Sequence, residues 1–329
     1  MSDTEASSVE QTGSPDLNVQ AAQAPATQSA IEPAVLSAPE PPGYLWHPIE
    51  PPPPILELVP PPPPPKLIPN IGHVFVFILL ILPSLIGGYL VALFSLYATH
   101  PHVRLITLTQ EIGRNVMYAI SMQAAIYLVL WALSALVFTL WWGSFAKGIH
   151  WNIAAAFRWS LILVGLGLLT GLAITLAGNF LPMPKAPPIL EDLTKSAAGA
   201  WTLLAFGITL APLTEELAFR GFLLPSLVNI FRWLERRNVI GEATVRVIGI
   251  PLSIVLTSIP FALMHAQQVS NSWGPVLLIG CVSIILCIVR LATDSVAAGV
   301  MVHCAYNLTL FSGLLYQTDW FRHLDKLKA

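Results

Sequence analysis

The sequence has 329 residues, of which 55% are hydrophobic and only 10% are charged, with a mean hydropathy of +0.68. Soluble domains carry about 25% charged residues, so this composition excludes water as the solvent for most of the chain. The formal net charge of −2 provides no excess of basic residues for phosphate contacts, and we expect no nucleic-acid partner.

Residues 1–70 differ in composition from the rest of the chain. They contain 18 of the 29 prolines, with runs at 51–54 and 60–65, and eight acidic residues against one lysine, Lys66. Proline lacks a backbone N–H and favours the extended polyproline II conformation, so we predict a disordered, acidic, proline-rich arm. A spacer is the simplest role for such an arm, and a ligand for a proline-recognising partner module is the alternative.

Residues 71–329 form the predicted transmembrane helical domain. A bilayer core of about 30 Å needs about 20 apolar residues per helix. Charge-free windows of roughly this length occur at 74–98, 116–142, 159–183, 196–214, 247–264, 273–289 and 295–318. No segment alternates as strands do, so the spans should be helices, which satisfy their backbone polar groups internally. We predict an all-α, polytopic transmembrane bundle of about seven to eight helices, because the apolar pattern continues past charged residues at 214–231.

The distribution of arginine predicts the orientation of these spans. The connection after the fourth window is the richest in arginine, with Arg232, Arg236, Arg237 and Arg246. Because connections rich in Lys and Arg stay in the cytoplasm, we place this one there. The N-terminal arm is then cytoplasmic as well, and residues 266–272 lie on the opposite side.

Three charged residues lie at the end of the fourth window: Glu215, Glu216 and Arg220. Glu216 and Arg220 are four positions apart, so on a helix they share a face in the order that favours an ion pair. Glu215 points about 100° away and has no partner at helical spacing, which makes it a candidate general base. The alternative is an ordinary charged helix end at the membrane surface.

Two further polar pairs lie in later windows. Phe261 and His265 are four positions apart, so the phenyl ring can pack beside the imidazole on one helix face. The alternative is that His265 lies at the membrane interface, as a lone histidine at a helix end more often does. His303 and Asn307 share a helix face in the middle of the last window, where they can donate to an oxyanion, hold a water molecule or help bind a metal. The alternative for this pair is a structural hydrogen bond between helices.

Together these pairs supply one carboxylate, two imidazoles and one amide in apolar sequence. Polar side chains at membrane depth are costly and usually functional. If the helices bundle, the four groups can converge to activate water and to stabilise the tetrahedral intermediate of amide hydrolysis. The predicted catalytic residues are therefore Glu215, His265, His303 and Asn307.

Three elements of the sequence resemble the motifs of the CPBP intramembrane protease family, which includes type II CAAX prenyl endopeptidases and abortive-infection-type membrane proteases. The elements are Glu215-Glu216-x-x-x-Arg220, Phe261-x-x-x-His265 and His303-x-x-x-Asn307. Their order, spacing and apolar setting all match the family, and the resemblance covers about residues 195–315, the predicted protease core.

The resemblance implies an intramembrane endopeptidase that hydrolyses a peptide bond of a membrane-associated substrate, near its membrane anchor. In the family, the position of Glu215 activates the attacking water, with the position of His265 as its close partner. The positions of His303 and Asn307 are assigned to the oxyanion or to a metal. Supporting roles fall to Glu216, Arg220 and Phe261. We expect an integral protein of a bacterial cytoplasmic membrane.

The sequence leaves a metal-dependent and a metal-free mechanism open. Glu215, His265 and His303 are side chains of the kind that hold a catalytic divalent metal such as Zn²⁺ with one position open for water. Their spacing lacks the compact His-Glu-x-x-His pattern of metalloproteases. We expect no organic cofactor.

Two other functions compete with proteolysis. A proton-coupled transporter would also place Glu and His in the membrane, but it predicts duplicated halves, and the sequence contains no repeat. A non-catalytic immunity or scaffold protein of the same fold is the second alternative. The presence of Glu215, His265, His303 and Asn307 together argues against it.

Overall fold

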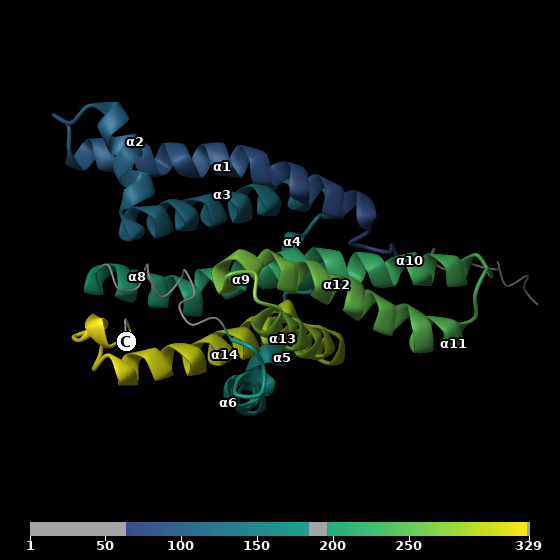
Figure 1. Ribbon diagram of the computed structural model, residues 1–329. Helices are drawn as coiled ribbons and strands as arrows, with labels where there is room; N and C mark the ends of the chain where they lie inside the picture. Colours follow the sequence, from purple (N-terminus) through teal and green to yellow (C-terminus); the bar gives the residue numbers. More distant parts are fainter. Residues whose placement is uncertain (1–63, 184–195, 328–329) are drawn as a thin grey trace, which may run out of the picture. The chain divides into compact units, whose positions relative to one another are not determined.

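The computed structural model describes residues 64–183 and 196–327, which are almost entirely helical and contain no strand in either range (Figure 1). Seven helical segments of these ranges are long and apolar enough to cross a membrane. They are Ile71–Thr99, Val116–Trp142, Ser160–Gly178, Ala197–Arg236, Glu242–Met264, Trp273–Thr293 and Val296–Gln317. The predicted fold class, an all-α polytopic bundle, is confirmed.

The proline-rich arm falls mostly outside the described residues, which begin at residue 64. Its last described residues contact the protein through two proline carbonyls. Asn229 Nδ2 donates to Pro69 O at 2.7 Å, and Arg236 Nη1 donates to Pro65 O at 2.8 Å. The division of the chain into an arm over 1–70 and a helical domain over 71–329 stays a prediction.

The first half of the described chain contains three long helices and three short ones. They are α1 (Ile71–Thr99), α2 (Leu105–Arg114), α3 (Val116–Trp142), α4 (Phe145–Gly148), α5 (Ile153–Arg158) and α6 (Ser160–Gly178). Asn70 caps α1 by accepting the backbone N–H of His73, and α3 ends at Gly143, whose φ of +81° suits glycine. The helices α1 and α3 pack along each other (Figure 1).

The fourth span runs through four consecutive helical pieces. These are α8 (Ala197–Ile208), α9 (Leu210–Glu216), the π-helical segment η1 (Leu217–Leu223) and α10 (Leu224–Arg236). This continuity explains why the apolar pattern extends past the charged residues at 214–231, since one 40-residue helical segment crosses the region.

The remaining elements complete the bundle. They are α11 (Glu242–Thr244), η2 (Val245–Gly249), α12 (Ile250–Met264), η3 (Ala266–Val269), α13 (Trp273–Thr293), α14 (Val296–Gln317) and η4 (Leu324–Leu327). The helix α14 packs against α6, and α12 packs against α13. A core cluster of α6, α13 and α14 contains Leu163, Val282, Leu286 and Val302.

Two glycines of α6 permit the close approach of α14, the helix that carries His303. A Cβ atom at Gly167 would lie 2.4 Å from the carbonyl oxygen of Val302, and one at Gly171 would lie 2.6 Å from Cβ of Thr309. Small residues spaced four apart let membrane helices pack at short range. The position of α14 therefore depends on these two glycines.

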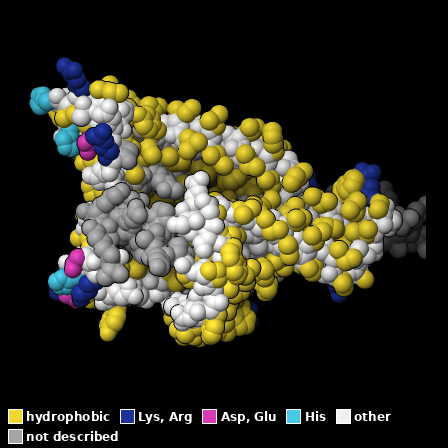
Figure 2. Space-filling view, in the orientation of Figure 1, with side chains coloured by type: hydrophobic (Ala, Val, Ile, Leu, Met, Phe, Trp, Pro, Cys, Tyr) yellow, Lys and Arg dark blue, Asp and Glu magenta, His cyan; other side chains and the backbone are white. Residues whose placement is uncertain are grey.

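The surface of the described residues suits a lipid environment. Figure 2 shows hydrophobic side chains over the middle of the visible face and charged ones gathered toward its two ends. Large apolar side chains are extensively exposed, with Leu161 at 89% and Phe180 at 87%. Soluble proteins rarely expose apolar surface on this scale, so the exposed residues match the membrane spans predicted from composition.

Candidate active site

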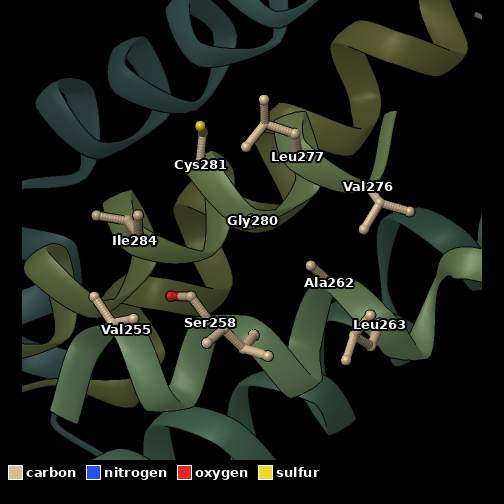
Figure 3. Close-up of a pocket in the computed structure, with 10 residues that line it drawn as sticks. Val255, Ser258, Ala262, Leu263, Val276, Leu277, Gly280, Cys281 and Ile284 are labelled. Carbon is tan, nitrogen blue, oxygen red and sulfur yellow. The ribbon is translucent and has the colours of Figure 1, made fainter. Parts of the chain in front are cut away.

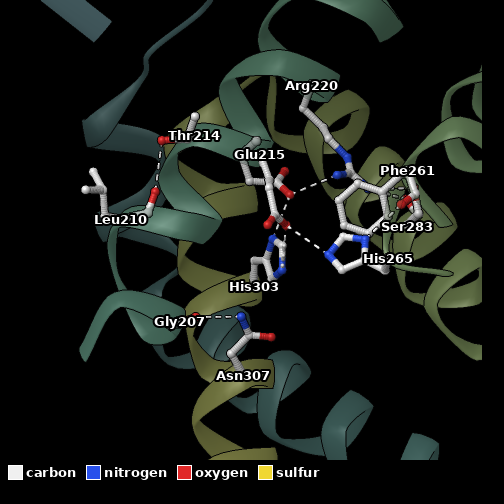
Figure 4. A network of polar contacts seen from close by, with 11 residues as sticks. Gly207, Leu210, Thr214, Glu215, Arg220, Phe261, His265, Ser283, His303 and Asn307 are labelled. Carbon is white, nitrogen blue, oxygen red and sulfur yellow. Dashed lines mark hydrogen bonds and ion pairs between the residues drawn. The ribbon is translucent and has the colours of Figure 1, made fainter. Parts of the chain in front are cut away.

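Glu215 lies between the two imidazoles of the predicted site. Its Oε2 atom is 3.7 Å from Nε2 of His265 and 3.7 Å from Nε2 of His303. Figure 4 shows these side chains gathered between α9, the end of α12 and α14. The side chains of Glu215, His265 and His303 are 14%, 16% and 4% exposed. Three of the four residues predicted to converge are brought together.

Each imidazole is oriented through its Nδ1 atom. Nδ1 of His265 lies 2.9 Å from the carbonyl oxygen of Phe261, one helical turn earlier. A carbonyl oxygen only accepts, so this Nδ1 carries the hydrogen. Nδ1 of His303 lies 3.0 Å from Oε1 of Glu216, across two helices. Both contacts leave the Nε2 atoms facing Glu215.

Glu216 and Arg220 form the ion pair expected from their spacing, and it is fully buried. Nη1 of Arg220 donates to Oε1 of Glu216 at 3.0 Å, and both side chains are 0% exposed. Nη2 of Arg220 donates to the carbonyl and hydroxyl oxygens of Ser283 in α13, each at 2.8 Å. A buried charge needs this degree of pairing to be tolerated, so the pair fixes one wall of the site.

Phe261 connects the ion pair to the imidazoles. Its ring is 2% exposed and lies 4.6 Å from the Arg220 guanidinium, close enough for a cation–π contact. The same ring lies 5.0 Å from the imidazole of His265 and 6.0 Å from that of His303. Its predicted place beside His265 agrees with the geometry.

Asn307 lies one turn beyond His303 but does not contact the Glu–His cluster. Its Nδ2 atom donates to the carbonyl oxygen of Gly207 at 2.7 Å (Figure 4). Gly207 is near the end of α8, where the helix breaks at Thr209, with φ −128° and ψ −84°. One amide hydrogen of Asn307 therefore caps the broken helix, and the second remains for another acceptor.

The wide turn after Glu216 sets the local geometry of the fourth span. Residues Leu217–Leu223 form a π-helical segment, in which the N–H of Leu224 donates to the carbonyl of Phe219. Such segments are rare and occur frequently at functional sites. The two glutamates lie directly before the wide turn, and Arg220 lies within it.

Two site residues carry no motif signal in the sequence. Ser283 binds Arg220 through both of its oxygens, as described above. Gly299 lies one turn before His303, and a Cβ atom there would be 2.6 Å from Oε2 of Glu216. In the sequence, the close approach of Glu216 to α14 is indicated only by the small size of Gly299, which shares a helix face with His303.

The residues named as metal ligands do not form a metal-binding cluster. Among residues 64–183 and 196–327, no group of three or more His, Cys, Asp and Glu side chains is arranged to hold a metal ion. Oε2 of Glu215 lies 3.7 Å from Nε2 of His265 and 3.7 Å from Nε2 of His303. We derive no step through a metal, and the predicted Zn²⁺ stays a prediction.

A separate apolar cavity of about 300 Å³ opens between α12 and α13 (Figure 3). Its walls include Ala262 and Gly280, and none of the predicted site residues lines it. Ala262 directly follows Phe261 in α12, but Glu215, His265 and His303 are not among the residues that line the cavity.

Comparison with known proteins finds one family model that matches the segment carrying the candidate site. Residues 197–309 match the family model described as type II CAAX prenyl endopeptidase Rce1-like, and all three motifs lie inside this segment. The resemblance inferred from the motifs is confirmed, and at the level of the family the match supports a CAAX-type intramembrane protease. Together with the seven apolar helices it makes the chain an integral membrane protein. Neither a curated protein nor a solved structure matches the chain.

Proposed function

We propose that this protein is an endopeptidase that hydrolyses a peptide bond close to the membrane anchor of its substrate. The match of residues 197–309 to the Rce1-like type II CAAX prenyl endopeptidase family model supports this proposal. The attacking group is a water molecule activated by Glu215. The observation that carries this proposal is the position of one carboxylate oxygen 3.7 Å from two imidazole Nε2 atoms.

This spacing favours a water molecule as the link between the three groups. A separation of 3.7 Å is longer than a direct hydrogen bond, and polar contacts of this length are often bridged by water. With Nδ1 of each imidazole directed to another acceptor, the neutral form presents Nε2 as an acceptor toward Glu215. Three converging acceptors need a hydrogen donor between them, and water supplies two hydrogens.

Hydrolysis then proceeds in two proton transfers. Glu215 takes one proton from the water as the oxygen attacks the carbonyl carbon of the scissile bond, which gives a tetrahedral oxyanion. The proton held by Glu215 then passes to the amide nitrogen and the C–N bond breaks. The products are a carboxylic acid and an amine, which exchange a proton in water to become a carboxylate and an ammonium group. His265, at 3.7 Å, holds the water in line with Glu215.

The oxyanion is bound on α14. His303 is held beside it by the contact of its Nδ1 atom with Glu216. Asn307 contributes its second amide hydrogen, because its first is bound to Gly207. Donors placed for the developing charge typically contribute a factor of about 10²–10³ in kcat each.

Glu216, Arg220 and Phe261 act as supports in this proposal. Glu216, paired with Arg220, holds His303 through Nδ1, and the Phe261 ring packs against both the guanidinium and the imidazole of His265. Glu216 does not act as a base in this proposal, because its charge is paired with that of Arg220.

The substrate proposal follows from the membrane setting. Glu215 and His303 lie inside spans, and His265 directly follows one, so a scissile bond that reaches them must lie within or beside the bilayer. A peptide carried by a lipid or helical anchor meets this condition. The cytoplasmic N-terminus and the bacterial membrane remain part of the proposal.

Purified protein in lipid vesicles provides the test. Wild type should cleave a membrane-anchored fluorogenic peptide, and Glu215→Gln should lower kcat by at least about 10³-fold while leaving the folded fraction unchanged. Glu111→Gln in α2, an exposed position, is the matched control and should cleave like wild type. Full activity of Glu215→Gln would contradict the proposed proteolytic function and would favour a scaffold or transport function.

A further inference from the structure

Arg290 is a buried cation that the proposed chemistry does not use. It lies in the last turn of α13, and the residue is 4% exposed. Its Nε atom donates to the carbonyl oxygen of Arg220 at 3.2 Å, and its Nη1 atom donates to Oδ1 of Asp294 at 2.9 Å. The guanidinium thus joins a loop carboxylate to the backbone of the wide turn in the fourth span.

The Arg220 carbonyl receives no hydrogen bond from either of the helical positions that would normally supply one. In a regular α-helix it would accept the N–H of Leu224, but that N–H donates to Phe219 instead. The π-helical pattern would supply the N–H of residue 225, which is a proline and has none. Buried carbonyls are almost always hydrogen-bonded, and Arg290 supplies the missing donor.

Two loops hold Arg290 from its other end. Asp294 is in the left-handed region with φ +47°, and its Oδ2 atom lies 2.9 Å from Nδ1 of His150, which has φ +59°. The backbone N–H of Val296 donates to His150 O at 3.1 Å, and the Ser295 hydroxyl donates to Asn152 O at 2.7 Å. The loop before α5 and the loop before α14 are therefore tied together beside Arg290.

We propose that Arg290 is a positioning residue of the active site: its Nε–H replaces the missing helical donor at Arg220 and keeps the wide turn after Glu216 in one conformation. Glu215 and Glu216 directly precede this turn, and Arg220 within it binds Glu216. The inference rests on the proposed function, because it assigns Arg290 a part in placing Glu215.

Arg290→Lys isolates the proposed contact. Lysine keeps the positive charge for Asp294 four positions away, but it has a methylene group where arginine has Nε–H. We expect kcat to fall about tenfold with KM unchanged, and amide hydrogen exchange to become faster in peptides covering 217–224. Arg246→Lys is the matched control, because Arg246 also pairs with an acidic residue four positions away, Glu242, at an exposed site. It should change neither quantity.

Pro225→Ala provides a rescue. Alanine restores an N–H at residue 225, which lies five positions after Arg220 as the π-helical pattern requires. In the Arg290→Lys background it should recover part of kcat and slow the exchange of 217–224 again. A purely structural loss of packing at Arg290 would not respond to a backbone donor on another helix.

The outcomes separate this inference from the proposed function. Unchanged exchange in 217–224 together with wild-type kcat for Arg290→Lys overturns the role of Arg290, even when Glu215→Gln is inactive. Failure of Pro225→Ala to restore either quantity overturns the link through the Arg220 carbonyl. An active Glu215→Gln variant overturns the proteolytic function instead, and the exchange measurement still decides whether Arg290 fixes the turn.

Discussion

Glu216 and His303 lie 87 positions apart in the sequence, yet Oε1 of the first is 3.0 Å from Nδ1 of the second in a fully buried contact. The same carboxylate oxygen accepts from Arg220 at 3.0 Å. Glu216 therefore couples α9 to α14, and the second glutamate of the pair orients the imidazole while the first faces it.

Loss of the Glu216 charge should destabilise the fold strongly. Glu216→Gln leaves the guanidinium of Arg220 buried without its counter-ion, which costs about 3–5 kcal/mol when one partner of a buried pair is removed. Denaturation in mild detergent should show this loss. Glu242→Gln removes an exposed ion pair of the same spacing and should cost only about 0–1 kcal/mol. Equal stability of the two variants would contradict the role assigned to the buried pair.

Gly299 should not tolerate a methyl group. A Cβ atom there would lie 2.6 Å from Oε2 of Glu216, so Gly299→Ala must displace the carboxylate that orients His303. We expect a fall in kcat of about tenfold or more, because misplacement by about 1 Å can cost about 10²-fold. Gly280→Ala, whose Cβ would meet Ala262 at an ordinary 3.7 Å, serves as the control in the same peptide assay. A fully active Gly299→Ala enzyme would show that Glu216 does not need its present position.

Removal of metal ions should leave activity intact. In the proposed mechanism the water is activated by Glu215 and held by His265, with no metal taking part. Dialysis against a chelator, followed by elemental analysis and the cleavage assay, measures this. Loss of activity that returns on addition of Zn²⁺ would replace the metal-free step by metal chemistry at Glu215, His265 and His303.

Asp294 should contribute stability that depends on pH. Burial acts to raise the pKa of this carboxyl, but its hydrogen bonds to His150 and Arg290 outweigh burial and hold the pKa below the usual value of 3.8. A depressed folded-state pKa means that the contribution is present above pH 3.8 and is lost as the pH falls through the folded value. The melting temperature of wild type should therefore fall toward that of Asp294→Asn below pH 3.8. A constant difference between the two proteins across this range would contradict the prediction.

The sequence was sufficient to predict the spans and the core of the site. The seven windows correspond to the seven spans because an apolar run of membrane length has few alternatives to a helix. The motifs at Glu215, His265 and His303 predict side chains that converge, and these three do. Helical spacing alone predicted the pair of Glu216 and Arg220.

Other features depend on tertiary contacts that have no sequence period. The wide turn at Leu217–Leu223 has no marker in the apolar pattern of the sequence, which continues through it. Arg290 lies one residue beyond the charge-free window, where it resembles an ordinary loop cation, whereas α13 continues to Thr293 and buries it. Asn307 matches its motif, but the break in α8 engages its amide at Gly207.

The most direct test of the account is a double-mutant cycle between Glu215→Gln and His265→Gln, with kcat measured on one anchored peptide in vesicles. Two groups that hold and activate one water molecule act as a unit, and such residues are strongly non-additive. The double variant should therefore be about as slow as Glu215→Gln alone. Losses that multiply would mean that the two side chains serve separate steps, and the shared water would have to be abandoned.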